Sequence, residues 1–337
     1  MGDEKVLVTG GGGFLGRCVV DQLLEQGAQV KSFSRHFYPD LKEKNVGQIT
    51  GDIADFDAVV RAAEDVDIVY HIAAKAGIWG KRSEFFKVNV IGTENVVQAC
   101  LKNNVNRLVY TSSPSVVFHG GNMENADESA PYPEKYDAAY PETKALAEKK
   151  VIQTSSDSLL TIILRPHLIW GPGDNHLVPT LIRNARRLKR IGDGTNRVDT
   201  IYVENAAKAH LLAAKALEQK PWLSGNVYFI SQDEPVNLWD MVDSIINTAG
   251  LPPVKGAVSE KNAIAAGVVF ETLYSLLNIR KDPPMTKFAA KELATSHWFN
   301  ISRAKKDLGY VPEISTDQGL ELLRLNFAEK NKEENLI

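Results

Sequence analysis

Four consecutive glycines at positions 10–13 follow an apolar run at 5–9 and precede Phe14, Leu15 and Gly16, where a helical pattern begins. Glycine has no side chain to keep a phosphate away from backbone N–H groups, and a helix N-terminus carries partial positive charge. A strand, a turn and a helix start in this order are typical of a site for a nucleotide pyrophosphate. The glycine pattern alone is a weak signal, so its interpretation depends on the rest of the chain.

Length and composition limit what the chain can be. With 337 residues it is long enough to form a large α/β domain with a smaller lobe. Its formal net charge of −3 creates no positive electrostatic field that would attract nucleic acid, so we do not expect nucleic acid as a partner. Cys18 and Cys100 fall in helical patterns without metal-ligand neighbours, so we expect neither a disulfide nor a metal site. No charged-then-apolar leader precedes the first strand, and we expect a cytoplasmic protein.

Apolar, β-rich runs alternate with amphipathic helical patterns through the first half of the chain. The predicted strands are 6–9, 29–34, 48–51, 68–72, 107–112 and 160–164, and the predicted helices include 15–26, 56–63, 88–102 and 139–153. Strands that are apolar on both faces and separated by helices indicate a parallel sheet covered on both sides. We therefore predict an α/β fold with a doubly wound parallel Rossmann sheet.

The alternation breaks down after Pro166. Further patterns predict a helix at 202–217, a strand at 227–231 and a helix at 238–249, followed by irregular helical sequence. We predict a dinucleotide-binding domain at 1–165, to which 201–231 returns. A smaller, mainly helical C-terminal substrate lobe would comprise 166–200 and 232–325, with a flexible tail at 326–337.

Two later segments have unusual composition. The stretch 263–277 is nearly all apolar, but at about 1.5 Å per residue it is too short to cross a hydrocarbon core of about 30 Å. We predict a buried or cavity-covering helix there, with a membrane-surface contact or a partner face as the alternative. The basic run 183–190 is interpreted as a solvated face, with docking of an acidic partner or anionic substrate as the alternative.

Three residues can carry acid–base chemistry. Tyr140 and Lys144 are four apart and share one face of a predicted helix. A free tyrosine has a pKa of about 10, and a neighbouring ammonium lowers it toward the range that a proton donor needs. Ser113 ends the fifth predicted strand, and ligands of open α/β sheets lie outside the carboxyl ends of the strands. Ser113 is therefore placed to hydrogen-bond a substrate carbonyl oxygen beside the tyrosine.

With these residues in place, the chain resembles an extended short-chain dehydrogenase/reductase. The resemblance covers residues 5–325 and is carried by motifs in the family's order: Thr9-Gly10-x-x-Gly13-x-x-Gly16, Gly51-Asp52-Ile53, His71-x-Ala73-Ala74, Asn89-Val90-x-Gly92-Thr93, Ser112-Ser113, Tyr140-x-x-x-Lys144 and Arg165-Pro166.

This resemblance implies the roles of individual residues. It implies that two groups of residues bind the cofactor. The residues at the pyrophosphate would be Gly10, Gly13, Phe14, Leu15 and Gly16. The residues along the rest of the cofactor would be Asp52, Ile53, Ala73, Ala74, Lys75, Tyr140, Lys144 and Pro166. Ser113, Tyr140 and Lys144 would be the catalytic triad, supported by Asn89.

The residues at the end of the second predicted strand indicate which of the two nicotinamide cofactors the chain prefers. A carboxylate there would hydrogen-bond the ribose hydroxyls of NAD(H) and repel a 2′-phosphate, but positions 33–36 contain no acid. Arg35 can pair with a phosphate through two N–H groups. We predict a preference for NADP(H), with NAD(H) as the alternative.

Within this superfamily the chain resembles the branch of 3β-hydroxysteroid dehydrogenases and decarboxylating sterol-4-carboxylate dehydrogenases. Local matches also resemble the 2-alkyl-3-oxoalkanoate reductases of bacterial long-chain olefin synthesis, in three segments: 74–80, 112–118 and 140–145. That resemblance implies reduction of a β-keto acid to the β-hydroxy acid, with hydride delivered to C3 and a proton given by Tyr140. The implied partners are a lipid-like substrate, a second copy paired through helices near 85–103 and 139–153, and other enzymes of the same pathway.

A long alkyl substrate would need an apolar tunnel, for which Trp79, Phe118, Trp170 and the stretch 270–277 are candidate walls. Its carboxylate would need a polar partner, and we name three cations without ranking them: Lys75, Lys81 and Arg82.

The sequence is also compatible with three other functions. They are oxidation of a 3β-hydroxysteroid or carboxysterol, epimerisation of a nucleotide sugar, and a dinucleotide-sensing module without chemistry. Pro114-Ser115 follows Ser113 where sugar-nucleotide dehydratases have an acidic pair, which argues against dehydration.

Overall fold

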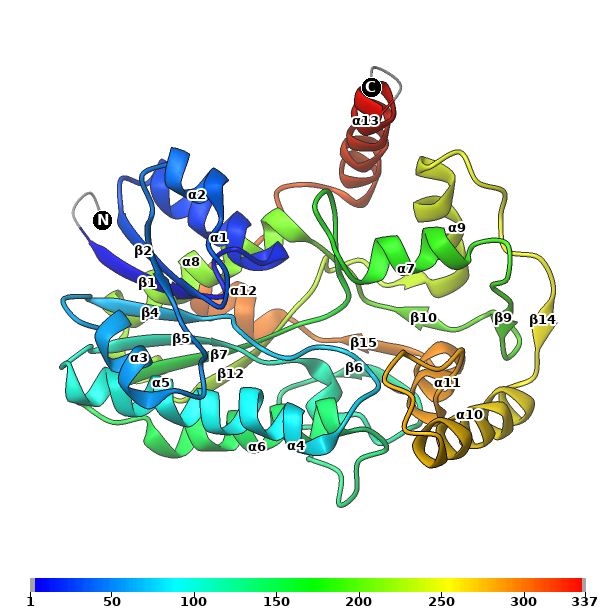
Figure 1. Ribbon diagram of the computed structural model, residues 1–337, viewed down its shortest axis with the longest axis horizontal. Coiled ribbons are helices and arrows are strands. Elements are labelled where there is room, and N and C mark those ends of the chain that lie inside the picture. Colours follow the sequence, from blue (N-terminus) through cyan, green and yellow to red (C-terminus); the bar gives the residue numbers. More distant parts are fainter. Residues whose placement is uncertain (1–3, 335–337) are drawn as a thin grey trace.

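The structure is a computed structural model that describes residues 4–334. Its centre is a seven-stranded parallel sheet in the order β12-β7-β5-β4-β1-β2-β3 (Figure 1). The strands are β1 (Lys5–Thr9), β2 (Gln29–Ser34), β3 (Gly47–Thr50), β4 (Ile68–His71), β5 (Arg107–Thr111), β7 (Leu160–Pro166) and β12 (Asn226–Ile230). The predicted doubly wound Rossmann sheet is confirmed, and all seven of its strands were predicted.

Helices cover both faces of this sheet. One face carries α1 (Phe14–Glu25) and α8 (Val203–Gln219), while the other carries α3 (Phe56–Ala62), α5 (Gly92–Lys102) and α6 (Ala139–Thr154) (Figure 1). Alternate residues of β1 reach different cores, because side chains along a strand point to opposite faces. Val6 and Val8 join one buried cluster and Leu7 joins the other, which is why the strands read as continuous apolar runs.

A second region lies beyond the carboxyl ends of these strands (Figure 1). It contains a small sheet in the order β13-β10-β15-β6, and two strand pairs, β8 with β11 and β9 with β14. Its strands are β6 (Met123–Ala126), β8 (Ile169–Trp170), β9 (Arg190–Ile191), β10 (Arg197–Val198), β11 (Ile201–Tyr202), β13 (Val236–Asn237), β14 (Ala257–Val258) and β15 (His297–Phe299). Its helices are α7 (Leu177–Asn184), α9 (Leu238–Thr248), α10 (Glu260–Leu276), α11 (Lys287–Ala294) and α13 (Thr316–Glu334).

The boundary between the two regions differs in detail from the predicted one. Strand β6 lies within the segment assigned to the dinucleotide-binding domain, yet it pairs with β15 in the small sheet. Helix α12 (Ser302–Leu308) lies within the segment assigned to the substrate lobe, yet it packs against α8 and β12. Residues 326–334, predicted as a flexible tail, continue α13, and 335–337 lie outside the described residues.

The helix predicted at 88–102 begins earlier and is interrupted. Its path runs through α4 (Arg82–Phe85), a π-helical segment η1 (Phe86–Ile91) and then α5. A π-helical turn adds a residue and is frequent at functional sites. The segment η1 packs against α6. The remaining short elements are α2 (Pro39–Glu43) and two 3₁₀ turns, η2 (Pro114–Val117) and η3 (Pro221–Leu223).

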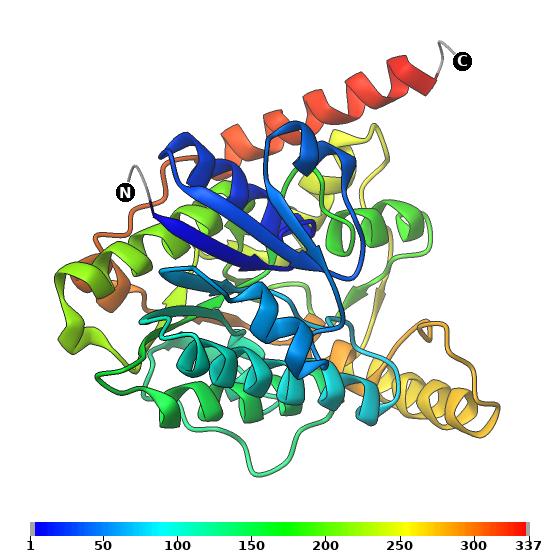
Figure 2. The same cartoon turned by 60° about the vertical axis from the view of Figure 1, so that its left-hand side comes forward.

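Helix α10 contains the apolar stretch singled out in the sequence. It projects from the body of the molecule together with α11, against which it packs (Figure 2). Large apolar side chains are exposed in its second half and at its C-cap: Val268, Val269, Leu273, Leu276 and Leu277. Between residues 4 and 334, no helix combines the length and the hydropathy needed to cross a bilayer.

Candidate active site

The loops that leave the carboxyl ends of the parallel strands bring the predicted residues to one edge of the sheet. Gly10 follows β1, Ala73 follows β4, Ser113 follows β5, and Pro166 ends β7. These strands are neighbours in the sheet, so their ends lie side by side. The predicted cofactor loop and the predicted catalytic serine therefore share one edge.

The glycine loop forms a tight cradle. Gly10 has φ +74°, and a Cβ there would lie 3.1 Å from the Ala73 Cα. At Gly16 a Cβ would lie 2.0 Å from the Gly10 carbonyl oxygen, so any side chain would separate the loop from α1. Gly13 is the N-cap of α1 and supplies no side-chain cap, which leaves the first N–H groups of the helix for another acceptor. This arrangement fits the pyrophosphate of a dinucleotide.

Tyr38, which the sequence analysis did not single out, covers this loop. A Cβ at Gly12 would lie 2.0 Å from the Tyr38 ring, so only glycine allows the ring to pack there. Arg17 fixes the arrangement, because its Nε donates to the Gly12 carbonyl at 2.9 Å and its guanidinium lies 5.3 Å from the Tyr38 ring centroid. Arg17 also pairs with Asp40 at 2.9 Å. A tyrosine after the second strand carries no sequence signal that distinguishes it from a surface residue.

The residues predicted near the adenosine end lie after β2 and β3. Asp52 accepts a hydrogen bond from Lys87 Nζ at 2.7 Å, and this contact lowers the Asp52 pKa, with a smaller contribution from the charge of Arg35. Arg35 is exposed, so its guanidinium is free to meet a ligand. Ile53 is buried, and its carbonyl accepts from Asn95 at 3.0 Å.

A chain of buried hydrogen bonds connects the cofactor strand β1 to the π-helical segment. Thr93 Oγ1 donates to the Asn89 carbonyl at 2.6 Å, so it accepts from His71 Nε2 at 2.9 Å. His71 Nδ1 then accepts from Thr9 Oγ1 at 2.8 Å, and Thr9 Oγ1 accepts from the Ala73 N–H at 3.2 Å. Burial lowers the His71 pKa to about 3, which keeps the ring neutral. His71 is therefore a structural connector.

Asn89 joins two chain segments that flank the site. Its Oδ1 accepts from the Lys75 N–H at 2.7 Å, and its Nδ2 donates to the Lys75 carbonyl at 3.1 Å. The same Nδ2 donates to Thr143 Oγ1 at 3.0 Å, between Tyr140 and Lys144 on α6. Asn89 is 1% exposed and touches no open space. The amide thus fixes the loop after β4 to the helix that carries the tyrosine and the lysine.

The structure brings Ser113, Tyr140 and Lys144 together at the start of α6. Burial raises the Tyr140 pKa, and the neighbouring Ser113 hydroxyl opposes this shift. The Ser113 hydroxyl also caps the turn η2, where it accepts from the Ser115 N–H at 3.2 Å. Ser113 therefore also stabilises the turn that follows β5.

Lys144 is held at the end of β5. Its Nζ donates to the Thr111 carbonyl at 2.6 Å and lies 4.3 Å from the Tyr110 ring centroid. The side chain is 2% exposed, and burial lowers its pKa to about 7, against the opposing charge of Glu148. Glu148 itself forms a buried ion pair with Arg165 at 2.5 Å. The Lys144 amine therefore titrates near neutrality.

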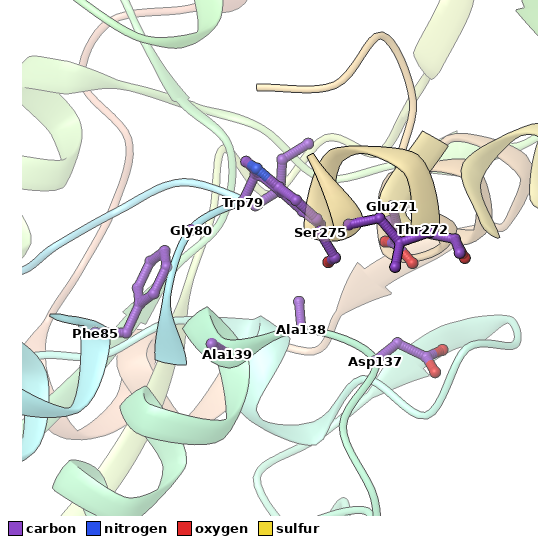
Figure 3. Close-up of a pocket in the computed structure, with 11 residues that line it drawn as sticks. Trp79, Gly80, Phe85, Asp137, Ala138, Ala139, Glu271, Thr272 and Ser275 are labelled. Atoms are coloured by element: carbon purple, nitrogen blue, oxygen red, sulfur yellow. The ribbon is translucent and has the colours of Figure 1, made fainter. Parts of the chain in front are cut away.

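A cavity of about 470 Å³ opens beside the start of α6 (Figure 3). Its walls are the Trp79 loop, the segment before Tyr140 and helix α10, with these lining residues: Ile78, Trp79, Gly80, Phe85, Asp137, Ala138, Ala139, Glu271, Thr272, Ser275 and Leu276. Trp79 Nε1 donates to the Ile279 carbonyl at 3.2 Å, which attaches the loop to the end of α10. The predicted cavity-covering role of this apolar helix agrees with this arrangement.

Trp170, which we predicted to line an apolar tunnel for the substrate, does not line this cavity. It is fully buried against Tyr202, and its Nε1 donates to Thr200 at 3.3 Å, so it belongs to the core under α13. Phe118 packs against Phe288 on α11, with ring centroids 5.9 Å apart. Aromatic residues in the sequence do not reveal which of them face a cavity, because core packing uses the same side chains.

Two of the three candidate cations for a substrate carboxylate are already paired. Arg82 holds Glu142 through two hydrogen bonds of 2.8 and 2.7 Å, and Lys75 lies 3.2 Å from Glu84. The basic run 183–190 begins in the last turn of α7 and ends at the start of β9, where Arg190 pairs with Asp243 at 3.0 Å.

Comparison with known proteins agrees with this geometry. The model of the 3-beta hydroxysteroid dehydrogenase/isomerase family matches residues 7–258, and the chain belongs to this family. Among curated proteins, a 2-alkyl-3-oxoalkanoate reductase of Stenotrophomonas maltophilia is 47% identical over 96% of this chain and 99% of its own length. The 2-alkyl-3-oxoalkanoate reductase of Shewanella oneidensis is 44% identical over 95% of this chain and 86% of its own length. The decarboxylating sterol-4-alpha-carboxylate 3-dehydrogenase of Mus musculus is 34% identical over 94% of this chain and 89% of its own length.

The solved structures that resemble the chain support its fold. A UDP-glucuronic acid 4-epimerase from Bacillus cereus, solved with NAD, has a TM-score of 0.73 and 22% identity over 97% of this chain and 99% of its own. At that identity the likeness shows a shared Rossmann architecture and nothing finer. Membership of the family makes the chain an NAD(P)-dependent oxidoreductase.

Proposed function

We propose that the chain reduces a 2-alkyl-3-oxoalkanoate to the 2-alkyl-3-hydroxyalkanoate with NADPH, in long-chain olefin biosynthesis. The observation that carries the proposal is the placement of Ser113, Tyr140 and Lys144 at the end of β5 and the start of α6, next to the cavity that Ala138 and Ala139 line, in a chain 47% identical to a reductase of that name. The bound nicotinamide would supply the hydride to C3 of the substrate. Tyr140 would give its proton to the developing alkoxide, and Ser113 would hydrogen-bond the same oxygen.

Lys144 and Asn89 support this proton transfer in different ways. The Lys144 ammonium would stabilise the phenolate left on Tyr140, which offsets the effect of burial on the phenol. Asn89 does not touch the substrate space, and it positions α6 through Thr143. We therefore assign Asn89 a positioning role and keep the catalytic roles for the other three residues.

A substrate panel tests the proposed activity. NADPH consumption is followed with a 2-alkyl-3-oxoalkanoate, a 3-ketosteroid and a UDP-hexose, and the first should be consumed with a kcat/KM at least tenfold above the others. Tyr140→Phe should abolish turnover while NADPH binding, measured by fluorescence titration, is retained, because only the transferred proton is lost. Preferred turnover of the steroid would favour the 3β-hydroxysteroid alternative, and a fully active Tyr140→Phe would refute the proton-donor assignment.

The preference for NADP(H) over NAD(H) is also a proposal. It is supported by the exposed Arg35 at the end of β2 and by the absence of an acid between Phe33 and His36. Arg35→Ser should lower the ratio of kcat/KM for NADPH to that for NADH by roughly tenfold or more, since a charged hydrogen bond contributes about 1.5–3 kcal/mol. An unchanged ratio would assign Arg35 to the solvated surface.

We further propose how the molecule meets its surroundings. A lipid-like substrate would enter beneath α10, whose exposed apolar face adjoins the cavity and offers a peripheral contact with a membrane surface to an otherwise cytoplasmic protein. A homodimer would form through the outer faces of η1–α5 and α6, which expose Ile91 and Leu146. Other enzymes of the pathway would be further partners.

A further inference from the structure

The glycine loop is attached to the end of β2. The Gly10 N–H donates to the Phe33 carbonyl at 2.8 Å, and a Cβ at Gly11 would lie 2.6 Å from Ser32 Oγ. In a Rossmann fold, residues at the end of the second strand of the unit bind the 2′ substituent of the adenosine ribose. In a bound dinucleotide this substituent would therefore lie between the glycine loop and the residues that follow β2.

The chain after β2 turns back onto this loop and brings an acidic side chain to a basic one. The Tyr38 ring packs on Gly12, as described above, and Asp40 in the first turn of α2 reaches Arg17 on α1. Two contacts join Arg17 to Asp40, from Nη1 to Oδ2 at 2.9 Å and from Nη2 to Oδ1 at 3.2 Å. The carboxylate thus occupies a pair of guanidinium N–H groups of the kind that binds a phosphate equally well.

The Arg17 guanidinium is fixed in orientation and yet open to solvent. Its Nε donates to the Gly12 carbonyl and its plane lies near the Tyr38 ring, so it is held at the glycine loop. The side chains of Arg17 and Asp40 are 43% and 41% exposed, so a ligand can reach both. An ion pair with this exposure contributes little to stability, and exchange of the carboxylate for a more highly charged anion therefore costs little.

We propose that Arg17 binds the 2′-phosphate of NADP(H) and that Asp40 competes with this phosphate for the Arg17 guanidinium. The inference rests on the proposed preference for NADP(H). A 2′-phosphate would take the place of the Asp40 carboxylate on Arg17, whereas the 2′-hydroxyl of NAD(H) is uncharged and would leave the ion pair intact. Asp40 thus weakens the binding of NADP(H) and has no effect on the binding of NAD(H).

The test measures cofactor binding and needs no substrate. The dissociation constants of NADPH and NADH are determined by fluorescence titration, and the ratio of Kd for NADH to Kd for NADPH is compared among variants. This ratio cancels any change in the glycine loop that affects both cofactors equally.

Substitutions of the two partners should change this ratio in opposite directions. Asp40→Asn removes the competing charge and should raise the ratio roughly three- to tenfold, through tighter binding of NADPH alone. Arg17→Gln removes both the charge and the paired N–H groups and should lower the ratio roughly tenfold or more. In the Arg17→Gln background, Asp40→Asn should change the ratio by less than about twofold, because no guanidinium remains to be released.

The ion pair between Lys44 and Asp21 provides a matched control. It also joins α2 to α1, at 2.6 Å, and its side chains are 45% and 42% exposed. Asp21 is one turn further along α1 than Arg17. Asp21→Asn removes the same charge from the same pair of helices and should change the ratio by less than about twofold.

Four results would overturn the inference. They are an unchanged ratio in Asp40→Asn, equal changes in Asp40→Asn and Asp21→Asn, a full effect of Asp40→Asn in the Arg17→Gln background, and weaker binding of NADH by Asp40→Asn. The last result would show that Asp40 binds the ribose hydroxyls of NAD(H). A wild type that binds NADH as tightly as NADPH would refute only the proposed preference, because the ratios of the variants still test the competition.

Discussion

At the scale of single residues, the site depends on side chains that never meet the substrate. Asn89 uses three hydrogen bonds to hold the Lys75 backbone and Thr143 in place. Thr93 and His71 extend that contact to Thr9 on the cofactor strand. A continuous buried network therefore positions the proposed catalytic groups relative to the proposed cofactor loop.

This network leads to a prediction about Asn89. Asn89→Ala should lower kcat by roughly tenfold or more, because α6 loses its register against the loop after β4. It should also lower the free energy of unfolding by about 1–3 kcal/mol, since the Lys75 N–H and carbonyl lose their partners. Both quantities are measurable by steady-state kinetics and urea denaturation.

Asn95→Ala is the matched control for this prediction. Asn95 is on α5, which continues directly from η1, and it donates one hydrogen bond, to the Ile53 carbonyl after β3. It should cost about 1 kcal/mol of stability and leave kcat unchanged. Equal effects of the two variants on kcat would show that Asn89 has no special positioning role.

At the scale of elements, α10 combines two surfaces. Glu271, Thr272 and Ser275 line the cavity, with Leu276 (Figure 3), while Val269 and Leu273 are exposed and do not line it. A helix buried in a core would not leave such side chains in water. The same helix thus bounds the substrate space and presents an apolar surface beside its opening.

A pair of charged substitutions should separate these two surfaces. Leu276→Glu puts a carboxylate at the cavity wall and should raise KM for a long-chain substrate more than for a short-chain one. Leu273→Glu puts the same charge at an exposed position of α10 that does not line the cavity, and it should leave both KM values unchanged. Leu276 and Leu273 are 77% and 46% exposed, so each change should alter stability by less than about 0.5 kcal/mol.

Binding to anionic vesicles, measured by co-sedimentation, should fall for both variants if the outer face of α10 contacts a membrane. Equal KM changes in both variants would mean that the cavity wall and the outer face are not distinct.

At the scale of the whole molecule, the parallel sheet supplies one rigid edge and the second region closes it. Strands of a parallel sheet end at the same edge, so glycine loop, serine and tyrosine meet there. Residues distant in sequence then complete the site, because β6 and β15 pair in the small sheet and α11 binds Asp137. The carboxyl ends of the strands thus face a covered cavity.

The sequence by itself determined the sheet, its helices and the residues at its carboxyl edge. Those features follow from local apolar runs, from glycines that admit no side chain, and from the spacing between Tyr140 and Lys144. Only the tertiary structure decided that Tyr38 covers the glycine loop, that Trp170 belongs to the core, and that two lysines of α11 pair with Asp137. Each of these depends on contacts between segments far apart in the chain, and a buried aromatic or carboxyl side chain carries no local pattern that reveals its neighbours.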